Sequence, residues 1–109
     1  MLKRQFRLSS FKRIRGEKSI ASPLFALRFW ENGENNLKFG FVVSKKIDKR
    51  AVVRNRVKRR LSKSIEELFG KIKPGYNFVF IAKKAILEKS QPEIAVCIEE
   101  IFKKNEFIK

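Results

Sequence analysis

Two segments of the chain, residues 24–30 and 37–43, alternate large apolar side chains with polar or small ones. Alternation with a period of two is typical of a β-strand. The large apolar side chains that share one face of these segments are Phe25, Leu27, Phe29, Phe39, Phe41 and Val43. The polar, turn-forming residues 31–36 between the two segments predict an antiparallel hairpin.

A third segment, residues 76–82 (YNFVFIA), is apolar almost throughout. An uninterrupted apolar run of this length is expected for a central strand that is covered on both faces. A shorter strand is predicted at residues 17–20, before the break at Ser22 and Pro23.

Between the second and third of these segments, apolar residues recur every three or four positions, which is the period of an amphipathic helix. The stripe consists of Val53, Val57, Leu61, Ile65 and Leu68. It predicts a helix over about residues 49–69, with Asp48 as its N-cap and Gly70 at its end.

Two further helices are predicted toward the ends of the chain. Residues 90–93 (SQPE) form a capping box with Pro in the first turn. The inward positions that follow are Ile94, Cys97 or Ile98, Ile101 and Phe102. Near the N-terminus, Ser9 or Ser10 is placed to cap a short helix over residues 11–15, after a basic arm at residues 1–8.

The predicted order of elements is α-β-β-β-α-β-α, in a single domain that spans residues 1–109. This order is typical of an α+β two-layer sandwich with a four-stranded mixed sheet. The strand–helix–strand unit between residues 37 and 82 implies a parallel pair of strands. The general chirality rule makes such a crossover right-handed.

The chain carries 27 Lys and Arg residues against 11 acids, a formal net charge of +16. A field of this size promotes salt-dependent association with nucleic acid or an anionic membrane. No apolar run approaches the roughly 20 residues of a membrane span, and the N-terminus lacks the apolar stretch of a signal peptide. The single Cys is compatible with a reducing cytoplasm. We therefore expect a cytoplasmic protein with no membrane partner.

The positive charge is concentrated in residues 45–63, where ten of nineteen residues are Lys or Arg and Asp48 is the one acid. Arg54, Lys58 and Arg59 have no acid four residues away to pair with. Many of the cations also lie in the N-terminal half of the helix, where the helix dipole disfavours positive charge. This cost favours a polyanionic partner over a merely solvated face. The candidate residues for binding this polyanion are Lys45, Lys46, Arg50, Arg54, Asn55, Arg56, Lys58, Arg59, Arg60 and Lys63.

Residues 54–59 read Arg-Asn-Arg-Val-Lys-Arg and follow Ser44-Lys45-Lys46 at the end of a predicted strand. This pattern resembles the signature of the bacterial ribonuclease P protein subunit, and the resemblance covers essentially the whole chain. It implies a fold similar to ribosomal protein S5 domain 2-like folds, with an uncommon left-handed crossover. The chain departs from the family pattern at Ser62, where the family often has Arg.

The resemblance also implies a function, the protein subunit of ribonuclease P, and two RNA-binding regions. The basic helix would contact the catalytic RNA, with Asn55 either in that contact or bonded within the protein. The single-stranded 5′ leader of precursor tRNA would lie in a groove between the first helix and the sheet. By position, the groove residues are Phe11, Phe25, Leu27 and Lys46. A Phe on a strand is more often a core residue, so a structural role for Phe25 stays open.

The sequence predicts no hydrolytic centre, since it has no His and its 11 acids are scattered. We therefore assign no catalytic residue and no metal ligand. The resemblance implies that the RNA subunit cleaves precursor tRNA, with Mg²⁺ bound mainly by that RNA and the substrate. It implies the catalytic RNA and precursor tRNA as partners and no small-molecule substrate. The main alternative is a structural RNA-binding protein such as a ribosomal protein, and a second is a DNA-binding protein with the basic helix in a major groove.

Overall fold

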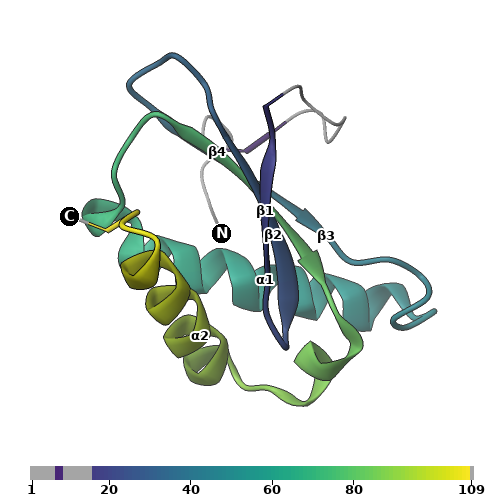
Figure 1. Ribbon diagram of the computed structural model, residues 1–109. Coiled ribbons are helices and arrows are strands. Elements are labelled where there is room, and N and C mark those ends of the chain that lie inside the picture. Colours follow the sequence, from purple (N-terminus) through teal and green to yellow (C-terminus); the bar gives the residue numbers. More distant parts are fainter. Residues whose placement is uncertain (1–6, 9–15, 109) are drawn as a thin grey trace.

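The computed structural model describes residues 7–8 and 16–108, and within them strands and helices follow one another in the order β-β-β-α-β-α (Figure 1). The elements are β1 (Lys18–Ala21), β2 (Phe25–Glu31), β3 (Leu37–Val42), α1 (Ala51–Leu68), β4 (Tyr76–Ala82) and α2 (Gln91–Lys104), with short 3₁₀ helices η2 (Phe69–Lys71) and η3 (Lys84–Glu88). This order confirms the predicted α+β class. The helix predicted at residues 11–15 and most of the basic arm lie outside the described residues.

The strands form one mixed sheet in the order β1-β2-β4-β3. β4 pairs in parallel with β3, as the strand–helix–strand pattern predicted, and antiparallel with β2. The predicted hairpin between β2 and β3 is therefore wrong. The physical reason lies in β4, whose residues Phe78, Val79 and Phe80 are all 0% exposed. A strand that is apolar on both faces is most stable in the centre of the sheet, so β4 separates the two strands.

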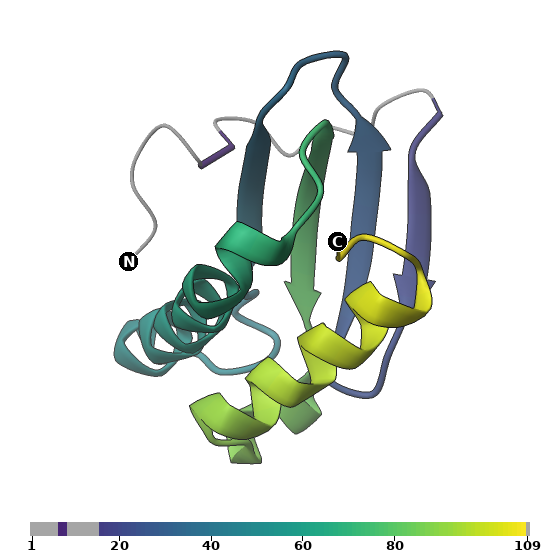
Figure 2. The ribbon, with the colours of Figure 1, turned by 90° about the vertical axis from the view of Figure 1, so that its left-hand side faces the viewer.

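The loop between β2 and β3 crosses over the start of β4 (Figure 2) and is bound to it there. The backbone N–H of Asn32 donates to the carbonyl of Gly75 at 2.9 Å, and the N–H of Gly75 donates to the carbonyl of Asn36 at 2.8 Å. Gly75 has a φ of 101°, which residues with a side chain rarely adopt. The polar residues that suggested a hairpin turn thus bridge two strand spacings, about 10 Å.

Both long helices cover the same face of the sheet (Figure 2). When the helices face the viewer, β3 and β4 both run downward and β4 lies to the right of β3. The crossover from β3 through α1 to β4 is therefore left-handed, as the family resemblance implied. The crossover is thus an exception to the general preference for right-handed connections.

The core lies between this face and the two helices, and Phe rings from the strands and from α2 fill its centre. Phe78 on β4 stacks on Phe39 of β3 at a centroid distance of 5.5 Å and on Phe102 of α2 at 5.0 Å. From α1, the predicted stripe is buried at Val57, Leu61, Ile65 and Leu68. Burying this stripe against the sheet directs the opposite, cationic side of α1 away from the core.

The observed N-cap of α2 agrees with the one predicted from the sequence, whereas that of α1 differs. At the start of α2 the capping box is formed, since Ser90 Oγ accepts from the N–H of Glu93 at 3.4 Å and Glu93 Oε1 accepts from the N–H of Ser90 at 3.2 Å. The N-cap of α1 is Arg50 and has no side-chain cap, so the prediction of Asp48 as N-cap is wrong. The α-helix ends at Leu68 and continues as η2 through Gly70.

Candidate nucleic-acid interface

The outward side of α1 is a continuous cationic surface. Arg56, Arg59 and Lys63 are exposed, while Arg54, Lys58 and Arg60 are half-buried along the edges of the apolar stripe. Within the described part of the chain, Arg56 and Arg59 make no ion pair or side-chain hydrogen bond. Their guanidinium groups therefore keep all of their donors for an external partner, and planar forks of this kind match phosphate oxygens well.

Asn55 lies among these cations and is also exposed. The described residues offer its side chain no hydrogen bond, either from a neighbouring strand or from the backbone. The alternative of a structural role for Asn55 thus gains no support, and its amide can donate to and accept from an external ligand.

Arg54 and Arg50 are held by the loop that precedes α1. Arg54 Nη1 donates to the backbone carbonyls of Asp48 and Lys49, at 3.2 and 2.8 Å. The carboxylate of Asp48 accepts from the Arg50 guanidinium, with an Nη2–Oδ2 distance of 2.9 Å. This ion pair and the hydrogen bonds to the carboxylate lower the pKa of Asp48 to about 2. Lys45, Lys46 and Lys49 on the same loop are exposed.

Arg60 differs from the other candidate cations because it joins two elements of the protein. Its Nη1 donates to the backbone carbonyl of Lys89 at 2.8 Å, just before α2 begins. Part of its guanidinium is therefore committed to the fold. Ser62, where the family pattern often has Arg, is 2% exposed and adds nothing to the charged surface.

The structure adds a basic segment that the sequence analysis did not select, residues 83–84 after β4. Because β3 and β4 are parallel and Val42 pairs with Ile81, the loops that follow both strands begin at the same edge of the sheet. Lys84 is exposed there, whereas Lys83 donates from Nζ to the carbonyl of Ser22 at 2.7 Å. Two adjacent Lys residues were visible in the sequence, but only the strand order places them beside residues 44–50.

The predicted leader groove is not assembled from the residues assigned to it. Phe25 and Leu27 are each 0% exposed and lie on the sheet face that the helices cover, with the ring of Phe25 5.0 Å from that of Phe80. A side chain without exposed surface cannot stack on a base, so their assignment as leader contacts is wrong. Lys46 is exposed in the loop before α1, and Phe11 lies outside the described residues.

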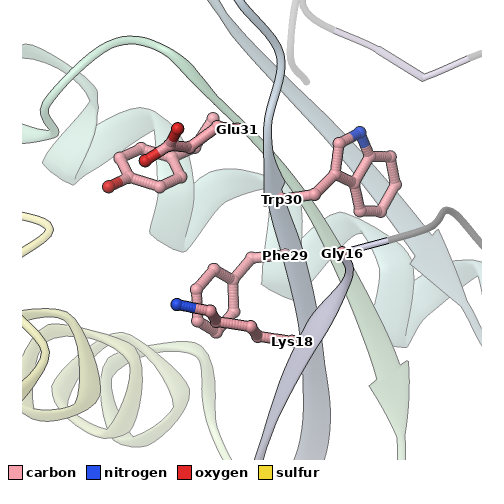
Figure 3. Close-up of a pocket in the computed structure, with 6 residues that line it drawn as sticks. Gly16, Lys18, Phe29, Trp30 and Glu31 are labelled. Atoms are coloured by element: carbon pink, nitrogen blue, oxygen red, sulfur yellow. The ribbon is translucent and has the colours of Figure 1, made fainter.

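A separate pocket of about 370 Å³ lies where β2 ends and β4 begins, at the opposite edge of the sheet from residues 44–50 (Figure 3). It is lined by Gly16, Lys18, Phe29, Trp30, Glu31 and Tyr76. With one acid and one Lys in its lining, this pocket does not extend the cationic surface.

Across residues 7–8 and 16–108, no three acidic, thiol or imidazole side chains are grouped so that they could hold a metal ion. None of the helices in this part of the chain is long and apolar enough to cross a membrane. Cys97, the one thiol, is half-buried, and burial raises its pKa.

Comparisons with known proteins agree with this geometry. The sequence model of the family Ribonuclease P matches residues 2–106. The chain is 40% identical over 91 residues to the ribonuclease P protein component of Alkaliphilus oremlandii, covering 84% of this chain and 79% of the relative. It is 38% identical over 96 residues to that of Caldanaerobacter subterraneus subsp. tengcongensis, covering 87% and 82%.

Two solved structures have the same fold. The ribonuclease P protein of Staphylococcus aureus superposes with a TM-score of 0.83 at 23% identity, over 95% of this chain and 98% of that one. The ribonuclease P protein of Thermotoga maritima superposes with a TM-score of 0.75 at 23% identity, over 83% and 84%.

Proposed function

The chain belongs to the bacterial ribonuclease P protein family, and we propose that it serves this endoribonuclease complex by binding the catalytic RNA through the cationic face of α1. Family membership makes the chain a component of ribonuclease P and implies the RNA of that complex as its partner. The proposal concerns which surface meets the RNA and what that contact does.

One observation carries the proposal: Arg56 and Arg59 are exposed on α1 and have no partner among the described residues. Within a single helix, cations three residues apart, as these two are, repel each other. Contact with phosphates removes this penalty and releases counterions from the RNA, which favours binding at low salt. Lys84 and the loop at residues 44–50 extend the same surface beyond the helix.

In this proposal the protein also helps to hold the 5′ leader of precursor tRNA. Lys46, exposed at the end of the sheet where α1 begins, would neutralise a leader phosphate. Phe11 would stack on a base of the leader, as the family resemblance implies. Phe25 and Leu27 have no part in this contact, because both are core residues.

The protein residues bind and orient RNA, and the cleavage chemistry belongs to the RNA subunit. The Mg²⁺ that the family resemblance implies would be held by that RNA and by the substrate. The described residues do not fit a metal site of their own, since no group of three suitable side chains is present among them.

Reconstitution with a ribonuclease P RNA tests the proposal. Cleavage of precursor tRNA at the mature 5′ end is measured at limiting Mg²⁺ with RNA alone, with RNA and protein, and with rigorously RNA-free protein. We expect protein to increase cleavage by the RNA and to have no activity alone. Ribosomal RNA and duplex DNA serve as competitors. If ribosomal RNA displaces the protein from ribonuclease P RNA as effectively as ribonuclease P RNA itself does, a ribosomal role is favoured. Equally effective displacement by duplex DNA would favour the DNA-binding alternative.

A further inference from the structure

Asp48 is the one acid in residues 45–63, and its carboxylate is turned toward the protein while its partner cation points to solvent. The Asp48 side chain is 14% exposed, whereas that of Arg50 is 72% exposed. Oδ1 of Asp48 accepts from the backbone N–H of Arg50 at 2.9 Å and from its Nε at 3.1 Å, and Oδ2 accepts from Nη2 at 2.9 Å. The carboxylate thus fixes both the backbone and the guanidinium of Arg50.

The backbone of the same residue holds a second cation. The carbonyl of Asp48, together with that of Lys49, accepts from Nη1 of Arg54. Arg50 and Arg54 are four residues apart, a spacing at which like charges on a helix repel each other. The Asp48 carboxylate is paired with Arg50 just before the start of α1, where a negative charge is favourable, and it also attracts the charge of Arg54. Asp48 therefore contacts both cations, Arg50 through its carboxylate and Arg54 through its backbone carbonyl, in the loop that leads into α1 (Figure 1).

We propose that Asp48 is a positioning residue, which holds Arg50 and Arg54 in the orientation in which they meet RNA. This inference rests on the proposed RNA-binding function of α1. It predicts a change in RNA affinity on removal of Asp48 that is opposite in sign to the change expected from net charge alone. Removing an acid from a cationic surface strengthens attraction to RNA if the acid acts only through its charge. If Asp48 acts by position, its removal weakens binding although the net charge becomes more positive.

Four variants separate these possibilities: Asp48→Ala, Asp48→Asn, Arg50→Ala and the double variant Asp48→Ala/Arg50→Ala. Glu100→Gln is the matched control, because it removes one exposed negative charge on α2, away from the cationic surface. Affinity for ribonuclease P RNA is measured at several salt concentrations, and circular dichroism checks that each variant is folded.

We expect Asp48→Ala to weaken binding about two- to fivefold, the range for one exposed ion pair, while Glu100→Gln binds as tightly as the unaltered protein or more tightly. Asp48→Asn is expected to bind between the unaltered protein and Asp48→Ala, because its amide oxygen still accepts from the N–H of Arg50. In the Arg50→Ala background, Asp48→Ala should have a smaller effect, because one of the two cations it positions is absent.

Equal or tighter RNA binding by folded Asp48→Ala would overturn the inference. If Asp48→Ala does not fold, Asp48→Asn decides the question. Tighter RNA binding by Asp48→Asn than by the unaltered protein would also overturn the inference. Failure of the unaltered protein to bind ribonuclease P RNA would instead overturn the proposed function.

Discussion

Arg60 of α1 donates a hydrogen bond from Nη1 to the backbone carbonyl of Lys89 at a distance of 2.8 Å, and this contact joins α1 to the segment that leads into α2. Nearby, Gln91 at the start of α2 donates to Ser64 Oγ at 3.2 Å. The C-terminal half of α1 therefore contributes to the packing of the two helices, whereas the exposed cations of α1 other than Lys63 lie in its N-terminal half.

This relationship predicts that Arg60 and Arg59 have different roles although they are neighbours. Arg60→Ala leaves the carbonyl of Lys89 without its donor, so we expect the free energy of unfolding to fall by about 1 kcal/mol. Arg59→Ala should change it by less than about 0.5 kcal/mol, since its side chain is exposed and has no described partner. Urea unfolding followed by circular dichroism measures both. Equal effects of the two variants would contradict the assignment of Arg60 as a link between the helices.

Arg56 and Arg59 are expected to act on RNA binding and not on stability. Replacing each by Ala should lower affinity for ribonuclease P RNA and reduce the slope of log K against log salt by somewhat less than about one unit per residue. Binding titrations from low to moderate salt give both quantities. Lys104→Ala, at the exposed end of α2, is the control for loss of one positive charge elsewhere. An unchanged affinity and salt slope in the Arg56→Ala/Arg59→Ala double variant would refute the role.

The contact between Asp48 and Arg50 predicts how this part of the protein responds to acid. The hydrogen bonds and charge of Arg50 lower the pKa of Asp48 from 3.8 to about 2 in the folded protein. A depressed folded pKa means that the stabilising contribution is fully present above about pH 3.8 and is lost as the pH falls through about 2. An NMR titration of the Asp48 carboxyl carbon should have its midpoint near pH 2. Arg50→Ala should move the midpoint upward, and Arg59→Ala should leave it in place. A midpoint near 3.8 in the unaltered protein would show that the ion pair does not form in solution.

Several features set by neighbouring residues were predictable from the sequence, although the N-cap of α1 was not. The Ser90 capping box and the buried stripe of α1 depend on spacings of three and four residues, which the sequence displays directly. The position of the cationic side of α1 could be predicted from the apolar stripe, because residues of the helix that do not lie on the buried stripe must face outward. The site residues on this helix were accessible to sequence reasoning for the same reason.

Most features set by residues far apart in the chain were not predictable in this way, although the parallel pairing of β3 and β4 was. Alternation along β2 separates its side chains into two faces but does not say which face the helices cover. It therefore could not test the groove assignment of Phe25 and Leu27 that the family resemblance implied, and both are core residues. The place of β4 between β2 and β3 depends on competition among all the strands for the centre of the sheet. Lys84 joins the cationic surface through that strand order alone.

Lys46 provides the test of the leader contact, because it is the groove residue that the structure describes as exposed. If it neutralises a phosphate of the 5′ leader, Lys46→Ala should weaken binding of precursor tRNA to the reconstituted enzyme about two- to tenfold at low salt and leave mature tRNA unaffected. A series of precursors with leaders of increasing length gives a sharper test. Variant and unaltered protein should bind short leaders equally and diverge only when the leader reaches Lys46. Lys104→Ala is again the control for charge. An equal loss for substrates with and without a leader would mean that Lys46 contacts the catalytic RNA or the tRNA body, and the leader assignment would fall.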